Sequence, residues 1–201
     1  MAKLVVSEFI TVDGVVEDPG GAEKFERGGW AFQFDRGPDG DKFKIDEVMA
    51  SDALLLGRTT YEGFAEAWPS REGEFADKFN TMPKYVVSST LSDPKWNNSH
   101  VISGDDLAAE VARLKDKHDG DILVNGSAQL VQALAEQGLV DEYRLMVFPV
   151  VLGKGKRLFG DTAESKPLKL TSSELAGETL IQIFEPAAPS ARSRAGTARA
   201  S

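Results

Sequence analysis

The stretch Ala53-Leu54-Leu55-Leu56-Gly57-Arg58-Thr59-Thr60-Tyr61-Glu62 decides how the chain is organised. Residues 53–56 are wholly apolar, which is typical of a strand buried on both faces, and a helical pattern follows Gly57. Free backbone N–H groups at such a helix start, together with the helix dipole, can bind an anion. Arg58 adds a planar fork of donors suited to phosphate. The alternative interpretation is a plain strand-to-helix turn with a solvated arginine.

The composition is that of a soluble globular protein with room for one domain. The chain has 201 residues, of which 41% are hydrophobic and 27% are charged. A formal net charge of −9 argues against nucleic acid or an anionic membrane as the main partner. A small anionic ligand remains compatible with this charge, because a local basic pocket can form in an acidic protein.

Cysteine is absent and histidine is nearly so, which limits the chemistry that the chain can perform. Disulfides, thiolate nucleophiles and cysteine-metal sites are excluded, and we expect no metal site from His100 and His118 alone. Apolar runs are all shorter than the roughly 20 residues needed to span a bilayer. The N-terminus has no signal-peptide layout, so the sequence predicts a cytoplasmic protein.

Strand and helix patterns alternate up to residue 138, after which only strands follow. We predict strands at 3–10, 53–56, 84–88, 100–102, 121–124, 142–151, 167–175 and 178–184. We predict helices at 41–51, 59–68, 74–82, 105–118 and 128–137, with the Ser127 side chain capping the last helix. This order predicts one α/β domain over residues 1–185, with a mixed, mostly parallel central sheet, helices on both faces and an antiparallel C-terminal hairpin. Residues 186–201 lack large apolar side chains and are expected to form a disordered tail.

Two further segments allow more than one interpretation. Residues 22–40 combine glycines with Phe25, Trp30, Phe32 and Phe34, and they fit either a flap over a ligand or a loop anchored by its aromatics. Trp30, Phe32 and Trp68 could also stack on a flat ring, although such residues are more often part of a core. The cations Lys154, Lys156 and Arg157 fit either a phosphate site or a solvated basic loop.

Three predicted strands end in small or hydroxyl residues: Gly57-Arg58-Thr59-Thr60, Ser88-Ser89-Thr90 and Asn125-Gly126-Ser127-Ala128. Ligands of open α/β sheets bind beyond the carboxyl ends of the strands, so together these turns predict a dinucleotide site. Gly126 would allow close approach to a diphosphate, and Arg58 with the serines would suit the extra phosphate of NADP. The G-x-G-x-x-G fingerprint is absent, so the ordinary dinucleotide fold is not indicated. Serine and glycine are also simply common in loops.

These motifs resemble those of a known family. Leu56-Gly57-Arg58-Thr59-Thr60-Tyr61-Glu62 is similar to the signature of dihydrofolate reductase-like proteins. The segments 124–127, 140–143 and 148–155 are similar to the riboflavin-biosynthesis reductase domain. The resemblance extends from Lys3 to Glu185 and implies a dihydrofolate reductase-like fold that binds NADPH across the strand ends. It implies hydride transfer to a small heterocyclic or ribosylaminopyrimidine-like substrate.

The resemblance also implies roles for individual residues. The adenosine phosphates would be held by the first turn and the serines, the diphosphate by the glycine turn, and the nicotinamide by the first strand and its loop. In that order, the residues are Gly57, Arg58, Thr59, Thr60, Ser88 and Ser89; Gly126, Ser127, Ala128 and Gln129; and Ile10, Thr11, Asp13 and Gly14. The zinc deaminase domain of the bifunctional riboflavin enzyme has no counterpart here, because the chain lacks cysteine and the necessary length.

Asp41 is the candidate catalytic residue. It stands before Gly57-Arg58 at a spacing comparable to that of the acidic residue on the first helix of folate reductases. A carboxylate there could bind or protonate a substrate ring, whereas the simpler interpretation is a capping residue at a helix start.

Three functions remain open from the sequence. The first is an NADPH-dependent reductase, the second a non-catalytic NADP(H)-binding module, and the third a homodimeric interaction protein in which the glycine turns serve only the backbone. Dimerisation would use the C-terminal strands.

Overall fold

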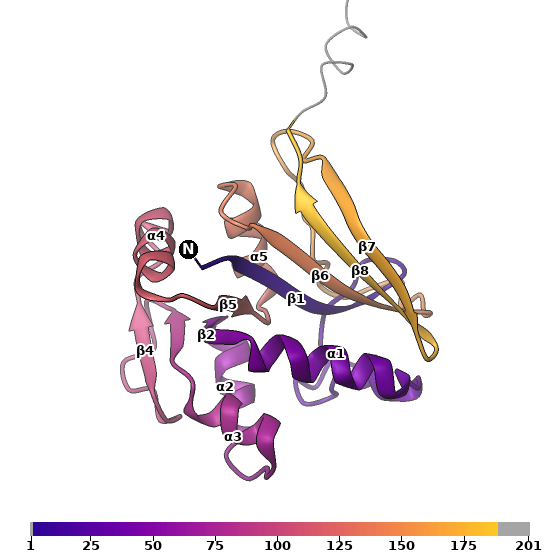
Figure 1. The fold of residues 1–201 in the computed structure, drawn as a ribbon, viewed down its shortest axis with the longest axis horizontal. Coiled ribbons are helices and arrows are strands. Elements are labelled where there is room, and N and C mark those ends of the chain that lie inside the picture. Colours follow the sequence, from indigo (N-terminus) through magenta and orange to yellow (C-terminus); the bar gives the residue numbers. More distant parts are fainter. Residues whose placement is uncertain (1, 189–201) are drawn as a thin grey trace, which may run out of the picture.

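Eight strands form one mixed sheet in the order β4-β3-β2-β5-β1-β6-β8-β7 (Figure 1). In this computed structural model, which describes residues 2–188, the first six strands of this order pair in parallel, and β8 pairs antiparallel with both β6 and β7. The strands are β1 (Leu4–Thr11), β2 (Ser51–Gly57), β3 (Lys84–Val87), β4 (Ser99–Ile102), β5 (Asp121–Val124), β6 (Glu142–Phe148), β7 (Leu168–Ala176) and β8 (Thr179–Pro186). The predicted mixed, mostly parallel sheet with an antiparallel C-terminal hairpin is confirmed.

Helices cover both faces of the sheet, as predicted. The helices are α1 (Gly37–Met49), α2 (Arg58–Ala67), α3 (Glu74–Thr81), α4 (Leu107–Lys117) and α5 (Ala128–Glu136), with a 3₁₀ turn η1 (Trp30–Gln33) before α1. Helices α4 and α5 share one apolar core with the sheet, and α1, α2 and α3 pack on the opposite face (Figure 1). Because both faces are covered, Leu54, Leu55 and Leu56 of β2 are fully buried, as their continuous apolar run predicts.

Three element boundaries differ from the prediction for local reasons. Helix α1 begins at Gly37 rather than Asp41, because Pro38 in its first turn has a backbone angle that suits a helix start. Ser51 belongs to β2, and its hydroxyl donates to the Glu47 carbonyl at 2.6 Å. Strand β6 ends at Phe148, next to Pro149, which has no N–H for the ladder.

The chain end is ordered slightly further than its composition predicts. Strand β8 includes Pro186, and the Ala187 amide donates to the Pro167 carbonyl at 2.9 Å. The rest of the predicted tail, residues 189–201, lies outside the described residues.

A buried lysine at the start of β3 connects the segments that lead into β3 and β4. Lys84 is fully buried, and its Nζ donates to the carbonyls of Asn80, Met82 and Asn97 at 2.7, 2.8 and 3.0 Å. Its ammonium lies 4.3 Å from the centre of the Trp96 ring. One side chain therefore donates to three carbonyls, of which that of Asn80, near the end of α3, also accepts from Asn97 Nδ2 at 3.4 Å.

We expect Lys84→Met to lower the free energy of unfolding by about 2–4 kcal/mol, because all three carbonyls lose the ammonium donor and that of Met82 is buried. Urea unfolding at pH 7 measures the effect. The control is Lys42→Met on the exposed side of α1, where we expect a change within about 0.5 kcal/mol. Equal stability of the two variants would show that the carbonyls find other partners.

Candidate functional site

The predicted cofactor residues lie along one edge of the sheet. Strands β3, β2, β5 and β1 are adjacent and parallel, so their carboxyl ends point the same way. In that spatial order, the ends carry Ser88 and Ser89; Gly57, Arg58, Thr59 and Thr60; Gly126, Ser127, Ala128 and Gln129; and Ile10, Thr11, Asp13 and Gly14. The fold therefore assembles one continuous row from four separate parts of the sequence.

The β2–α2 and β5–α5 turns touch through their glycines. The Gly57 amide donates to the Gly126 carbonyl at 3.2 Å. A Cβ on Gly57 would overlap the Ser127 hydroxyl, and a Cβ on Gly126 would lie 2.7 Å from Thr60 Oγ1. Gly126 also has φ +87°, which disfavours any side chain. Both glycines are thus required for the close contact between the two turns.

Helices α2 and α5 both begin in this row. Gly57 and Ser127 occupy their N-cap positions. At neither position does a side chain accept a hydrogen bond from the first-turn amides. The prediction that the Ser127 side chain caps α5 is wrong, because its hydroxyl packs against Gly57 instead. First-turn amides without a capping side chain are the donors that helix starts offer to phosphate.

Arg58 is the first residue of α2 and is the cation of this row. Its Nη1 lies 3.1 Å from a carboxylate oxygen of Glu62, one helical turn away, and both side chains are about half exposed. An exposed pair of this kind contributes little stability, so the guanidinium can exchange this partner for a ligand at little cost.

Several predicted side chains already make hydrogen bonds within the protein. The Thr11 hydroxyl donates to Asp13 Oδ1 at 2.7 Å and accepts from the Val15 amide at 2.9 Å. The Asp13 carboxylate also accepts from the amides of Leu152 and Gly153, and these bonds, led by that from Thr11, lower the pKa of Asp13. The Ser88 hydroxyl accepts from the Thr90 and Leu91 amides. The amides of Thr11 and Ser88 are engaged as well, with the carbonyls of Val15 and Ile102.

A cavity of about 180 Å³ lies beside the end of β1. It is lined by Phe9, Ala31, Phe32, Phe34, Asp35, Arg36 and Asp41. Asp41 therefore lines a cavity. It lies within α1, which begins at Gly37, so the simpler interpretation of Asp41 as the capping residue at a helix start is wrong. Its carboxylate pairs with Arg36 Nη2 at 2.6 Å. Aromatic walls and an ion pair suit a flat, polar ring.

The aromatics of the predicted flap have different roles. Trp30 is fully buried, and its Nε1 donates to the Glu17 carbonyl at 2.9 Å, so it anchors the loop to the core. Phe32 is 77% exposed at the cavity. Trp68 packs against Phe75 and Phe79 in an aromatic cluster formed by α2 and α3. It does not line the cavity.

The basic turn after β6 is held by the loop that follows β1. Lys156 pairs with Glu17 at 2.9 Å, and Lys154 pairs with Glu26. The Arg27 guanidinium donates to the Leu152 carbonyl. Both lysine side chains are still more than half exposed, so the turn agrees with the interpretation as a solvated basic loop, now with two surface ion pairs.

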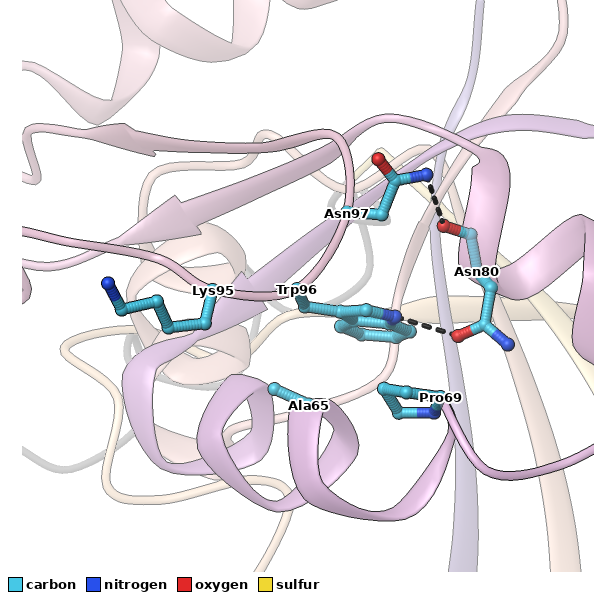
Figure 2. Close-up of a pocket in the computed structure, with 6 residues that line it drawn as sticks. All are labelled: Ala65, Pro69, Asn80, Lys95, Trp96 and Asn97. Atoms are coloured by element: carbon cyan, nitrogen blue, oxygen red, sulfur yellow. Dashed lines mark hydrogen bonds between the residues drawn. The ribbon is translucent and has the colours of Figure 1, made fainter.

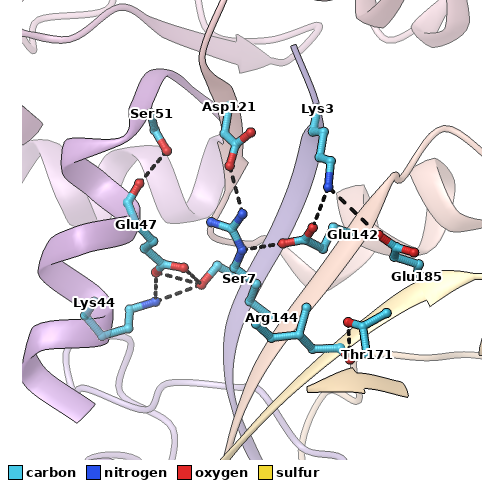
Figure 3. Close-up of polar contacts among 11 residues, drawn as sticks. Lys3, Ser7, Lys44, Glu47, Ser51, Asp121, Glu142, Arg144, Thr171 and Glu185 are labelled. Carbon is cyan, nitrogen blue, oxygen red and sulfur yellow. Dashed lines mark hydrogen bonds and ion pairs between the residues drawn. The ribbon is translucent and has the colours of Figure 1, made fainter. Parts of the chain in front are cut away.

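A layer of charged side chains between α1 and the sheet was not anticipated from the sequence (Figure 3). The Ser7 hydroxyl lies 2.8 Å from both Glu47 carboxylate oxygens and from Lys44 Nζ. On β6, Arg144 pairs with Asp121 at 2.8 Å and with Glu142 at 2.6 Å. Only the spacing of Lys44 and Glu47 on the inner side of α1 could have indicated this layer.

Glu8 was also missed, although it lies in the row. Burial raises its pKa to about 8, helped by the negative charges of Glu47 and Glu23 and opposed by Lys44 and the Gly126 amide. The signal that could have revealed it is an acidic residue within an apolar strand, Leu4–Thr11.

A second cavity, of about 390 Å³, lies at the other edge of the sheet and is lined by Ala65, Pro69, Asn80, Lys95, Trp96 and Asn97 (Figure 2). Asn97 and Asn80 precede the parallel strands β4 and β3, whereas the predicted cofactor residues follow their strands. Trp96 is only 4% exposed, and its indole N–H donates to Asn80 Oδ1 at 2.8 Å. The indole is thus largely occupied within the protein, and we assign no ligand to this cavity.

Two features are not found in the described part of the chain. Residues 2–188 contain no group of three or more His, Cys, Asp and Glu side chains arranged to hold a metal ion. Within the same residues, no helix has the length and apolar character needed to cross a membrane.

Comparison with known proteins places this geometry in a family. Residues 2–181 match the family model described as the RibD C-terminal domain. The chain belongs to the RibD C-terminal domain family. The resemblance inferred from the strand-end motifs is thereby confirmed.

Relatives of this RibD C-terminal domain protein include the uncharacterized protein YyaP of Bacillus subtilis, which is 28% identical over 90% of this chain and 93% of its own. A putative riboflavin biosynthesis protein from Shewanella sp. PV-4 has a similar structure, with a TM-score of 0.75, 21% identity and coverage of 94% and 100% of the two chains. Dihydrofolate reductase from Enterococcus faecalis, complexed with NADP(H), gives a TM-score of 0.61 at 15% identity, with coverage of 92% and 97%. These structures confirm a dihydrofolate reductase-like fold.

Proposed function

We propose that this protein is an NADPH-dependent reductase that transfers hydride to a small heterocyclic or ribosylaminopyrimidine-like substrate. The observation that carries the proposal is the continuous row of helix starts, glycine turns and Arg58 at the carboxyl ends of β3, β2, β5 and β1. The family and the NADP(H) in the Enterococcus faecalis enzyme support the same cofactor. When bound, NADPH supplies the hydride.

The residues of the row fit the cofactor in charge and in shape. Gly126 carries no side chain that could cover the backbone of its turn, and the α2 and α5 starts offer amides without a side-chain cap for phosphate. In our proposal, Arg58, Thr59, Thr60, Ser88 and Ser89 bind the adenosine phosphates. Gly126, Ser127, Ala128 and Gln129 bind the diphosphate, and Ile10, Thr11, Asp13 and Gly14 lie beside the nicotinamide.

The cavity at Phe9 is the proposed substrate site. It opens beside β1, the strand that carries the proposed nicotinamide residues. Phe9, Phe32 and Phe34 can pack on a flat ring, while the Arg36–Asp41 pair offers both a donor and an acceptor. We propose that Asp41 contacts the substrate ring and that Arg36 orients its carboxylate. Holding two rings face to face would supply much of the rate.

Binding of NADPH to the full chain is the direct test. We expect saturating NADPH to raise the melting temperature by several degrees, because a ligand at about 100 times its Kd adds about 2.7 kcal/mol of stability. Fluorescence titration with NADPH and NADH then gives both affinities. An unchanged melting temperature at millimolar NADPH would refute the proposal.

A non-catalytic NADP(H)-binding module is the second candidate, and the hydrogen bonds that Thr11, Asp13 and Ser88 already make within the protein favour it. Loss of absorbance of the reduced nicotinamide with pterin or ribosylaminopyrimidine substrates separates the two functions. Bound NADPH that is oxidised by neither class would favour the module.

We also propose that the protein is a homodimer that pairs through its C-terminal strands. Strand β7 is at an edge of the sheet, and its Leu170 and Leu175 are 50% and 76% exposed. Light scattering coupled to size-exclusion chromatography measures the molar mass. A monomer at all concentrations would contradict this interface.

A further inference from the structure

Glu8 lies beside the glycine turn of the proposed cofactor row. Strand β1 pairs with β5 in parallel, with Val6 opposite Val124, so Glu8 is level with Gly126, whose amide lies beside its carboxyl. The carboxyl oxygen Oε1 is buried and has no hydrogen-bond partner in the described structure. Asn125 Oδ1, one residue before Gly126, is buried without a partner as well, while its Nδ2 donates to the Ser7 carbonyl. Two shielded oxygens without partners therefore flank this strand end.

The surroundings of Glu8 favour its protonated form. A carboxylate oxygen buried without donors is unfavourable, and burial raises the pKa of Glu8 to about 8. Three charged groups act on it electrostatically: Lys44 and Glu47 of α1, and Glu23 of the loop after β1. Lys44 is already paired with Glu47, which weakens its effect on Glu8. At pH 7, the carboxyl is thus mostly protonated, and its O–H requires an acceptor.

We propose that Glu8 is a further cofactor-binding residue, which donates a hydrogen bond from its protonated carboxyl to the dinucleotide beside Gly126. This inference rests on the proposed function, because NADPH supplies the acceptor oxygens. A negatively charged Glu8 would repel the anionic cofactor, whereas the neutral form would not. Above pH 8, binding therefore takes one proton from solvent: the Glu8 carboxylate, the proton and NADPH combine, and no bond of the cofactor changes.

Calorimetric titration of the full chain with NADPH tests this linkage. At pH 9, heats measured in two buffers of different ionisation enthalpy should show uptake approaching one proton per NADPH, against nearly none at pH 6.5. The Kd should weaken about tenfold between pH 7 and pH 9, following the protonated fraction of Glu8. Phosphate monoesters are already doubly ionised in this range, so the cofactor itself contributes little.

Two variants sharpen the test. Glu8→Gln keeps the shape and a donor but cannot titrate, so it should bind NADPH with the same Kd at pH 7 and pH 9 and take up no proton. Glu23→Gln removes an exposed carboxylate that acts only electrostatically on Glu8, and it should retain most of the proton uptake. Identical proton uptake by Glu8→Gln and the natural protein would overturn the inference. Absence of uptake by the natural protein at pH 9 would also overturn it, and the cofactor assignment would stand.

Stability without cofactor provides an independent readout. An unfolded glutamate releases its proton near pH 4.5, whereas folded Glu8 keeps it up to about pH 8. The native state binds more protons in this window, so stability should fall as pH rises from 5 to 8. This slope should be reduced in Glu8→Gln; an unchanged slope would contradict the protonated carboxyl. If Glu8→Gln does not fold, proton uptake by the natural protein tests the inference by itself. Failure of the natural protein to bind NADPH at any pH would refute the proposed function together with this inference.

Discussion

Gly126→Ala is expected to lower the free energy of unfolding by about 2–4 kcal/mol and to remove measurable NADPH binding. The residue has φ +87°, which costs an alanine about 1–2 kcal/mol, and the added methyl would lie 2.7 Å from Thr60 Oγ1. The turn cannot withdraw freely, because the Gly57 amide donates to the Gly126 carbonyl at 3.2 Å. Urea unfolding and fluorescence titration with NADPH measure the two effects.

Gly63→Ala is the matched control for this substitution. Gly63 lies within α2, and a Cβ there meets nothing within 4 Å. We expect it to raise stability by up to about 1 kcal/mol, because alanine favours a helix over glycine, and to leave NADPH affinity unchanged. NADPH affinity in Gly126→Ala equal to that of the natural chain would show that the glycine serves only the backbone.

Arg58→Ala is expected to weaken NADPH binding about 10- to 100-fold and NADH binding less than about threefold. Charge-assisted hydrogen bonds from a guanidinium to a phosphate contribute about 1.5–3 kcal/mol, and NADH lacks the 2′-phosphate. The loss of the Glu62 pair should change stability by less than about 1 kcal/mol, since both side chains are about half exposed. Parallel titrations with the two cofactors measure the selectivity.

Arg113→Ala removes the same charge from a comparable setting. Arg113 is 51% exposed and pairs with Glu110 on α4 at 2.6 Å. It lies within α4 and is not one of the strand-end residues, so we expect both affinities to change by less than about twofold. Equal losses of NADPH and NADH affinity in Arg58→Ala would contradict its assignment to the 2′-phosphate.

The sequence predicts the sheet and the row well, because both depend on local signals. The apolar run before Gly57 requires a strand buried on both faces, and helices α4 and α5 follow their amphipathic patterns within one or two residues. Once the strands are parallel, the positions of Ser88, Gly57 and Gly126 along one edge follow from topology alone.

Features that depend on tertiary contacts were not predictable. The start of α1 was missed because its glycine-rich first turns resemble a loop, yet Gly40 is buried, with Ala176 and Met146 within 3.5 Å of where its Cβ would lie. The Ser127 cap failed because Gly57, distant in sequence, occupies the space beside its hydroxyl. Glu8 was missed because a single acidic residue in a strand gives no sign of which groups surround it.

Because the backbones of Gly57 and Gly126 are in direct contact, the residues allowed in one turn depend on those in the other, although the two turns lie far apart in the sequence. Neither strand-to-helix turn can change its residues, or be grafted into a related chain, without the other, because each turn limits the space available to the other. A change in the sequence of either turn must therefore be designed together with the other turn.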